Sequence, residues 1–180
     1  MNKVTVIGGG AAGLMAAIAA AEKGAQVSLI EPNERLGKKV NITGKGRCNV
    51  TNDTDLEGLM AHIPRNGRFL YSALSRFSSQ DTMAFFESCG VPLKVERGDR
   101  VFPVSDSAFD ITDALKGKVK ALRIRWIHDR AAAVETADGR VTAVTGEKGI
   151  YPSDAVIIAT GGVSYPGTGS TGDGYRIAAA

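Results

Sequence analysis

The pattern of apolar and polar positions in the first thirty-one residues predicts a strand, a helix and a second strand. Residues 4–7 form a short apolar run rich in β-branched side chains, which is typical of a buried strand. Residues 11–23 are rich in alanine and predict a helix that Gly24 ends. Residues 26–30 alternate apolar and polar side chains and predict the second strand. This order of elements is that of a βαβ unit.

The chain then loses its periodicity for a long stretch before two helices begin. Residues 32–52 are polar and rich in glycine, lysine and arginine, so we expect a functional loop without regular structure. Ser78 and Ser107 are each followed three residues later by an aspartate, which is typical of a helix N-terminus. The first of these helices is expected to run to about residue 88, where Gly90 follows.

Strands dominate the last third of the sequence. Residues 124–134 predict a strand, with Trp126 in the core, and Asp138-Gly139 predicts a hairpin turn into a strand over residues 141–144. Residues 154–159 form an apolar run that predicts a final buried strand leading into a glycine pair.

Three glycines lie between the first strand and the first helix, in the spacing Gly8-x-Gly10-x-x-Gly13. In this fingerprint the first glycine makes a tight turn, the second lets a pyrophosphate approach the backbone, and the third lets helix and strand pack closely. The N-terminus of the helix offers free N–H groups and a partial positive charge to the phosphates. Glu31 follows Gly13 by eighteen residues and is placed to accept hydrogen bonds from the ribose hydroxyls.

These patterns together predict an α/β fold of the Rossmann kind, with a parallel central sheet and an added β-hairpin or meander. The fingerprint indicates a dinucleotide and does not by itself separate FAD from NAD.

Composition changes this interpretation little. The chain has 180 residues, 43% of them hydrophobic, and a net charge of +3 that is spread along the sequence, so we expect no nucleic-acid partner. Residues 4–21 have the composition of a signal peptide or membrane helix, but the glycines interrupt the stretch, so we expect no membrane association. Cys48 and Cys89 belong to no CxxC or zinc-type pair, which favours a reducing, cytoplasmic location and predicts no metal site.

Three longer motifs resemble those of one bacterial flavoprotein family. They are residues 37–52 (GKKVNITGKGRCNVTN), residues 100–103 (RVFP), and residues 159–175, which contain ATGG and TGDG. The family's members are described as aminoacetone-oxidase-like, or as NAD(P)/FAD-dependent oxidoreductases of unassigned substrate. The resemblance implies an FAD-binding domain of the glutathione-reductase-like kind over residues 1–180. It also implies hydride transfer through the flavin, with a small-molecule substrate and with an amine or NAD(P)H as a donor.

The fingerprint and the resemblance together give a set of expected cofactor-binding residues. They are Gly8, Gly10, Ala11, Ala12, Gly13, Glu31, Pro32, Lys39, Thr43, Gly44, Gly46, Arg47, Cys48, Asn49, Thr160, Gly161, Gly162, Thr171, Gly172 and Asp173. No residue stands out as a dedicated general base, so the cofactor is expected to carry the chemistry. Two alternatives stay open: an NAD-binding dehydrogenase domain, and a non-enzymatic nucleotide-binding or redox-sensing module in which Cys48 is the reactive thiol.

Members of this flavoprotein family are longer than this chain. In them a substrate domain follows the TGDG stretch, and a further glycine-rich segment completes the flavin site. The resemblance therefore implies that the sequence is the N-terminal portion of such an enzyme. We expect the missing C-terminal half, or a second chain, to complete the site.

Overall fold

The computed structural model describes residues 2–179 and divides into two compact units. Unit 1 comprises Met1–Val40 and Leu115–Ala180, and unit 2 comprises Asn41–Ala114. We expected a single FAD-binding domain over residues 1–180, and that assignment stays a prediction.

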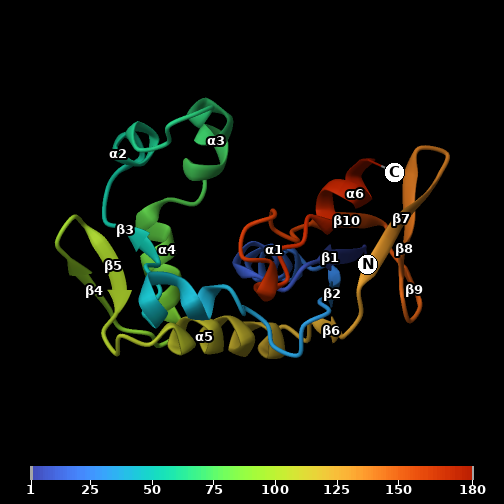
Figure 1. Cartoon of the computed structure of the whole chain (residues 1–180), viewed down its shortest axis with the longest axis horizontal. Coiled ribbons are helices and arrows are strands. Elements are labelled where there is room, and N and C mark those ends of the chain that lie inside the picture. Colours follow the sequence, from blue (N-terminus) through green and yellow to red (C-terminus); the bar gives the residue numbers. More distant parts are fainter. Residues whose placement is uncertain (1, 180) are drawn as a thin grey trace. The chain divides into compact units, whose positions relative to one another are not determined.

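A four-stranded parallel sheet forms the centre of unit 1 (Figure 1). Its order is β10-β1-β2-β6, with the bounds β1 Lys3–Ile7, β2 Gln26–Ile30, β6 Arg125–Ile127 and β10 Ala155–Ile158. Helix α1 (Ala11–Glu22) packs against β1 and β2 and buries Leu14 and Ile18. Val6 and Leu29 are neighbours in the sheet and are fully buried with them. The predicted βαβ unit and the Rossmann-like fold class are confirmed.

An antiparallel meander of three strands completes unit 1. Strands β7 (Ala131–Ala137), β8 (Arg140–Gly146) and β9 (Ile150–Pro152) pair in chain order. Asp138 and Gly139 both have positive φ, 51° and 71°, as the predicted two-residue hairpin turn requires. The 3-10 helix η2 (Pro166–Thr168) and helix α6 (Asp173–Ala179) follow β10.

The prediction of one strand over residues 124–134 is wrong, because β6 and β7 are separate strands in different sheets. The break lies at Asp129, whose side chain is 1% exposed. Its carboxylate accepts hydrogen bonds from the Tyr151 hydroxyl (2.6 Å) and from the N–H groups of Arg130 (2.7 Å) and Lys148 (3.1 Å). Burial alone would raise the pKa of Asp129, but these hydrogen bonds outweigh it and hold the pKa below its ordinary value.

The prediction of a fully buried last strand is also wrong. Within the described residues β10 is an edge strand, and Ile157 and Ile158 are 37% and 41% exposed. Trp126 lies on the opposite edge strand, β6, and is 42% exposed rather than in the core. Edge strands lack a neighbour on one side, which the run of apolar residues alone does not reveal.

Unit 2 consists of a small antiparallel sheet and short helices. The sheet has the order β3-β5-β4, with β3 Thr51–Asn52, β4 Leu93–Glu96 and β5 Arg100–Pro103. The helices are α2 Leu56–Ala61, α3 Gly67–Leu74 and α4 Ser79–Ser88, and α5 Ala108–Ala121 begins in this unit. Ser78 and Asp81 form the predicted capping box of α4. None of α2, α3, β3, β4 and β5 was predicted.

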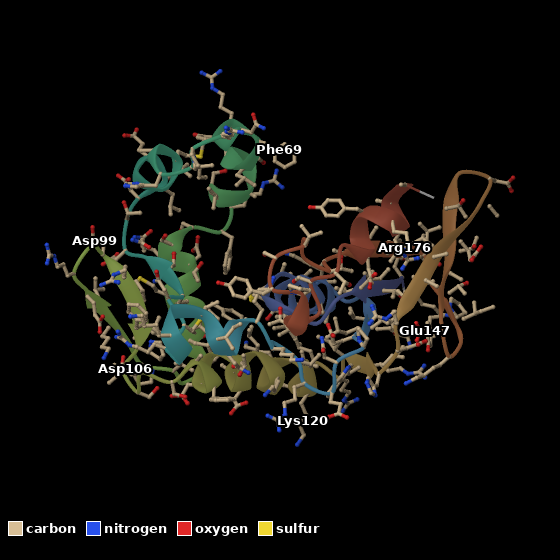
Figure 2. The ribbon with its side chains drawn as sticks, in the orientation of Figure 1. Phe69, Asp99, Asp106, Lys120, Glu147 and Arg176 are labelled. Atoms are coloured by element: carbon tan, nitrogen blue, oxygen red, sulfur yellow. The ribbon has the colours of Figure 1, made fainter. Side chains whose placement is uncertain are left out.

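The expected irregular loop over residues 32–52 is partly regular. It contains the 3-10 segment η1 (Val40–Gly46), kinked at Thr43–Lys45, and it ends in β3. Helices α2 and α3 have no buried residues, and Phe69 on α3 is 87% exposed, as its projecting ring in Figure 2 illustrates. Among residues 2–179 no helix has the length and apolar character needed to cross a membrane.

Candidate nucleotide site

The carboxyl ends of the parallel strands in unit 1 bring several predicted site residues together. The chain leaves β1 toward β2 on one side, while β10 returns on the other side of β1, so the strand order reverses beside β1. Gly8, just after β1, donates its N–H to Ile30 at 2.8 Å, and Ala159, just after β10, donates to Ile7 at 2.8 Å. In open α/β sheets ligands bind at this reversal point, outside the carboxyl ends of the strands.

Gly8 and Gly13 are needed because their neighbours leave no room. Gly8 has φ +107°, and a Cβ there would lie 2.5 Å from the carbonyl oxygen of Ala159. A Cβ on Gly13 would lie 1.7 Å from the carbonyl oxygen of Gly8, so the first turn of α1 rests directly on the glycine turn. Gly10 differs, because a Cβ there would meet nothing within 4 Å.

Gly9 is a part of the turn that the fingerprint does not include. A Cβ on Gly9 would lie 2.5 Å from the Leu36 side chain and 2.9 Å from that of Glu31. Its N–H donates to Glu31 Oε2 at 2.6 Å. The run of three consecutive glycines was the signal in the sequence that could have indicated this role.

The N-terminus of α1 is suited to an anion. Gly10 is the N-cap residue in an extended conformation, and no side chain caps the helix among the described residues. The N–H groups of Ala11, Ala12 and Gly13 belong to the first turn, which has no intrahelical acceptors. Uncapped N–H groups beside the open space at Gly10 fit a phosphate or pyrophosphate.

Glu31 follows β2 and is only 7% exposed, yet its carboxylate is well supplied with donors. Besides Gly9, the backbone N–H and the side-chain amide of Asn33 donate to Oε1 at 2.8 Å and 2.6 Å. A carboxylate offers roughly four acceptor positions, so these three bonds leave Oε2 with one for a ligand. Pro32, the next predicted residue, accepts at its carbonyl from His128 Nε2 at 2.8 Å. Asn33 was missed, because a single asparagine in a loop carries no distinctive pattern.

Lys39 meets the segment after β10. Its ammonium donates to the Ser164 carbonyl at 2.8 Å and to the Ser170 hydroxyl at 2.5 Å. Ser170 is 5% exposed, and its Oγ would lie 3.0 Å from a Cβ on Gly161. The structure thus brings the predicted residues Lys39 and Gly161 to the same side chain, Ser170, which the sequence analysis did not single out.

The predicted residues near α6 are fixed by local contacts. Gly172 donates its N–H to the Gly162 carbonyl at 3.2 Å, and a Cβ on Gly174 would lie 2.4 Å from Thr160 Oγ1. Thr171 donates to the Gly169 carbonyl at 3.0 Å. Asp173 opens α6 and pairs with Arg130 at 2.6 Å. The ATGG and TGDG stretches therefore pack on each other.

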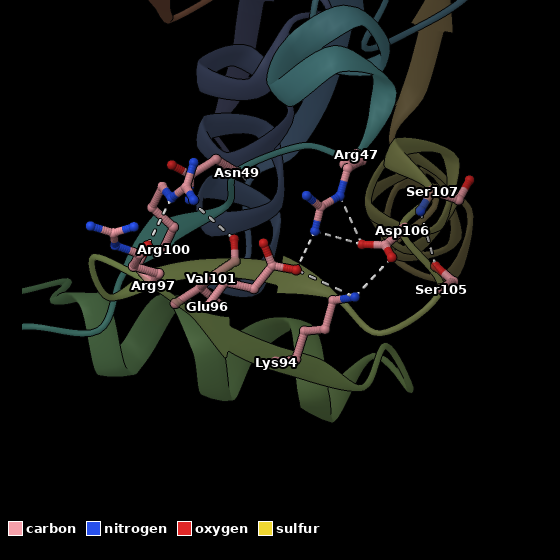
Figure 3. Close-up of polar contacts among 10 residues, drawn as sticks. All are labelled: Arg47, Asn49, Lys94, Glu96, Arg97, Arg100, Val101, Ser105, Asp106 and Ser107. Atoms are coloured by element: carbon pink, nitrogen blue, oxygen red, sulfur yellow. Dashed lines mark hydrogen bonds and ion pairs between the residues drawn. The ribbon is translucent and has the colours of Figure 1, made fainter.

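Six predicted residues, Thr43, Gly44, Gly46, Arg47, Cys48 and Asn49, belong to unit 2. Among them Arg47 lies in a cluster of four charges with Lys94, Glu96 and Asp106 (Figure 3). Arg47 pairs with Glu96 and, at 2.8 Å, with Asp106, while Lys94 reaches Asp106 at 2.8 Å. The Arg47 guanidinium also stacks over the Phe102 ring at 4.1 Å. Each positive group contacts both negative groups, so the charges of the cluster balance.

The cluster shifts the titration of its own members. Hydrogen bonding to Arg47, with the charges of Arg47 and Lys94, lowers the pKa of Glu96 despite desolvation. Hydrogen bonding to Lys94 has the same effect on the pKa of Asp106, with Arg47 contributing. Both carboxylates therefore stay ionised at neutral pH.

Cys48 is buried, and its neighbour Asn49 makes hydrogen bonds within unit 2. The Cys48 side chain is 6% exposed, and burial raises the pKa of its thiol more than a hydrogen bond with Thr43 lowers it. A protonated, buried thiol is a poor nucleophile, which weighs against the redox-sensing alternative. Asn49 donates its side-chain amide to the carbonyls of Thr51 (2.7 Å) and Val101 (3.1 Å). Gly44 and Gly46 have positive φ, 55° and 86°.

Comparison with known proteins gives a family match over nearly the whole chain. The family described as "HI0933-like protein Rossmann domain" matches residues 2–180. The 3-dehydro-bile acid delta(4,6)-reductase of Clostridium scindens is 36% identical over 182 residues, which cover 99% of this chain and 43% of that protein. The ribosomal RNA dihydrouridine synthase of Escherichia coli is 31% identical over 174 residues, which cover 96% of this chain and 42% of that protein. The chain thus spans about two fifths of the length of these relatives.

Solved structures share the fold at lower identity. A flavocytochrome c3 fumarate reductase in its open conformation has a TM-score of 0.74 and 24% identity, covering 99% of this chain and 40% of that one. The 3-ketosteroid-delta4-(5alpha)-dehydrogenase of Rhodococcus jostii has a TM-score of 0.68 and 19% identity, covering 91% of this chain and 47% of that one. At these identities the similarity establishes the fold alone.

Proposed function

The chain belongs to the HI0933-like Rossmann family, and we propose that it forms the FAD-binding part of a flavin-dependent oxidoreductase. One observation carries the proposal: the uncapped N-terminus of α1 opens onto free space at Gly10, beside a buried carboxylate at the end of β2. This is the arrangement that binds the pyrophosphate and the ribose of a dinucleotide. When bound, FAD supplies the acceptance and release of a hydride.

Different residues of unit 1 would bind the pyrophosphate and the ribose of the cofactor. The N–H groups of Ala11, Ala12 and Gly13 would donate to the pyrophosphate, and the absence of a side chain at Gly10 would let it approach. Glu31 would accept a hydrogen bond from the ribose, beside Pro32. Gly8 shapes the turn that aims these groups.

The other predicted residues of unit 1 serve the rest of the cofactor. They are Lys39, Thr160, Gly161, Gly162, Thr171, Gly172 and Asp173. For the predicted residues of unit 2, a contact with the cofactor stays a prediction; they are Thr43, Gly44, Gly46, Arg47, Cys48 and Asn49. Lys39 contributes a positive charge that its bonds to Ser164 and Ser170 hold in place. Positive charge and N–H donors near a flavin stabilise its reduced, more negative form.

For the substrate we propose a small molecule, with an amine or NAD(P)H as hydride donor. The names of the two relatives mention a bile acid and ribosomal RNA, which are too different to transfer a substrate to this chain. We also propose a cytoplasmic location, which the two free thiols, Cys48 and Cys89, support.

The test of the proposal is the cofactor itself. The purified chain is examined by visible absorption, and any nucleotide released by denaturation is identified. We expect a flavin spectrum, either as purified or after addition of FAD. A colourless chain that binds NADH and not FAD would indicate an NAD-binding domain instead. A yellow chain that neither NADPH nor an amine reduces would favour the non-enzymatic alternative for this chain.

Glu31→Arg tests the ribose contact. It replaces the acceptor by a donor and leaves the N–H groups of Gly9 and Asn33 facing a positive charge. We expect FAD affinity to fall at least about tenfold, corresponding to one lost charge-assisted hydrogen bond, as measured by flavin fluorescence titration. Glu34→Arg makes the same change of charge at an exposed neighbour and should retain FAD. Unchanged affinity in Glu31→Arg would refute the placement of Glu31.

A further inference from the structure

We propose that Asn33 is a positioning residue that couples the Glu31 carboxylate to the loop of residues 164–170, so that a nucleotide bound at Glu31 orders this loop. The inference rests on the proposed function, because it takes the ribose of the nucleotide as the ligand of Glu31. Nothing in the fingerprint or in the family motifs assigns a role to Asn33.

On one side, Asn33 holds the carboxylate. Its backbone N–H donates to Glu31 Oε1 at 2.8 Å, and its side-chain amide donates to the same oxygen at 2.6 Å. Oε2 instead accepts from Gly9. Asn33 therefore fixes the rotation of the carboxylate, and the acceptor position that these three bonds leave is on Oε2, the oxygen bonded to the glycine turn.

On the other side, the same amide reaches the loop. Asn33 Nδ2 donates to the Thr168 carbonyl at 3.3 Å. Gly169 stands at φ +99°, and a Cβ there would lie 2.6 Å from Nδ2, so the loop can come this close to Asn33 only with a glycine at this position. The two hydrogen atoms of one amide thus serve the carboxylate and the loop at once.

The loop depends on such ties, because it buries little of its own surface. Tyr165 in the loop is 68% exposed and Val163, just before the loop, is 70% exposed, so apolar packing contributes little to its order. Lys39 also holds the loop. Its ammonium donates hydrogen bonds to the Ser164 carbonyl and the Ser170 hydroxyl, at the two ends of the loop. Asn33 acts at the middle, at Thr168.

A shared side chain makes the coupling reciprocal. A ribose hydroxyl that bonds Glu31 restricts the carboxylate, which in turn restricts Asn33 and lowers the cost of its bond to Thr168. By linkage, whatever orders the loop strengthens nucleotide binding by the same factor.

Hydrogen–deuterium exchange of the full chain with ADP tests this inference. ADP carries the ribose and the phosphates without the flavin, so it reaches Glu31 and the glycine turn. The amides of Thr168 and Gly169, which donate to Tyr165 and Pro166, report on the loop. The amides of Ala11 and Ala12 report independently on whether the nucleotide has bound.

In the unaltered chain we expect saturating ADP to slow exchange at both reporters, at the loop by about fivefold to tenfold, as for one net hydrogen bond. In Asn33→Ala we expect protection of the turn to persist and protection of the loop to vanish. Asn33→Ser keeps a donor for Glu31 but is too short to reach Thr168, so it should behave as Asn33→Ala does. Asn52→Ala is the matched control, since it removes an amide that bonds Gly98 in unit 2, and it should retain both effects.

Loop protection that survives in both Asn33 variants would overturn the inference and leave the proposed function intact. If ADP protects neither reporter in the unaltered chain, the nucleotide site itself is wrong and the coupling falls with it. Lost protection of the loop with a protected turn supports the coupling, because a merely misfolded variant would lose both.

Discussion

Gly10 and Gly13 belong to the same motif, but the space around Gly10 is open and the space around Gly13 is filled. A Cβ on Gly13 would clash with the carbonyl oxygen of Gly8, whereas a Cβ on Gly10 would meet nothing within 4 Å. A glycine without neighbours, at φ −79° where any residue is allowed, is not required by the fold. Under the proposed function, its missing side chain leaves room for the pyrophosphate, so Gly10 would serve binding and Gly13 would serve folding.

The substitutions Gly10→Ala and Gly13→Ala should therefore separate binding from stability. We expect Gly10→Ala to cost less than about 1 kcal/mol of the free energy of unfolding, since alanine is a modestly poorer N-cap. The same change should weaken FAD binding about tenfold or more, because its methyl group fills the space of the pyrophosphate. Gly13→Ala should cost about 2–3 kcal/mol, since its Cβ would lie 1.7 Å from a backbone oxygen.

Urea unfolding and FAD titration measure the two effects. Trp126 is the single tryptophan of the chain and lies on β6 of unit 1, so its fluorescence follows the unit that contains both glycines. Equal losses of stability in the two variants would contradict the assignment of Gly10 to ligand binding.

At the scale of elements, the sequence predicted those that carry a local signal. The first βαβ unit, the capped α4 and the Asp138-Gly139 hairpin each contain residues that mark their ends in the sequence, and all three agree with the structure. The division of residues 124–134 was missed because its cause, the burial of Asp129 by Tyr151 and Lys148, comes from residues some twenty positions away. Edge exposure of β10 was missed for a similar reason, since the number of neighbours of a strand is not a local property.

The residues of the candidate site also differ in whether a local sequence signal reveals them. Gly8, Gly10, Gly13 and Glu31 could be found because one spacing encodes them all. Gly9 lies outside this spacing, and only the run of three glycines marks it. Asn33 and Ser170 could not be found from the sequence, because each contacts a partner from a different segment of the chain.

The four-charge cluster joins strand β4 to Arg47, just after η1, and to Asp106, between β5 and α5, and this predicts a pH dependence. Arg47 and Lys94 lower the pKa values of Glu96 and Asp106 in the folded chain. A lowered carboxylate pKa adds stability above the unfolded value of about 4, and this stability is lost as the pH falls through the folded value. Arg47→Met should therefore lower the unfolding temperature at pH 7, by about 2 °C for exposed pairs.

The decrease should shrink as the pH falls below about 4 and the carboxylates become protonated in both proteins. High salt at pH 7 should reduce it too, because exposed charges are screened. Thermal scans at several pH values measure the effect. Arg97→Met removes an exposed arginine outside the cluster and serves as the control. A decrease that is independent of pH would show that Arg47 acts through its packing on Phe102 instead.

At the scale of the whole molecule, unit 1 is assembled from two distant stretches of sequence. The glycine turn, Glu31 and Lys39 come from the first forty residues, while the segments after β10 come from the last third of the chain. The two stretches meet through β1 and β10, and through the ties from Asn33 and Lys39. A ligand that contacts both stretches therefore stabilises the folded state of unit 1 as a whole.

This predicts a shift of thermal unfolding that depends on ligand concentration. FAD at a hundredfold excess over its Kd adds about 2.7 kcal/mol to the stability of the folded state. For a chain of this size, this corresponds to a rise in the unfolding temperature of about 5–10 °C. Trp126 fluorescence reports the transition of unit 1. Glu34→Arg should keep the shift, whereas Glu31→Arg should lose most of it at the same FAD concentration. A rise with NADH as large as that with FAD would instead favour the NAD-binding alternative, because both ligands would then use the turn and Glu31 equally.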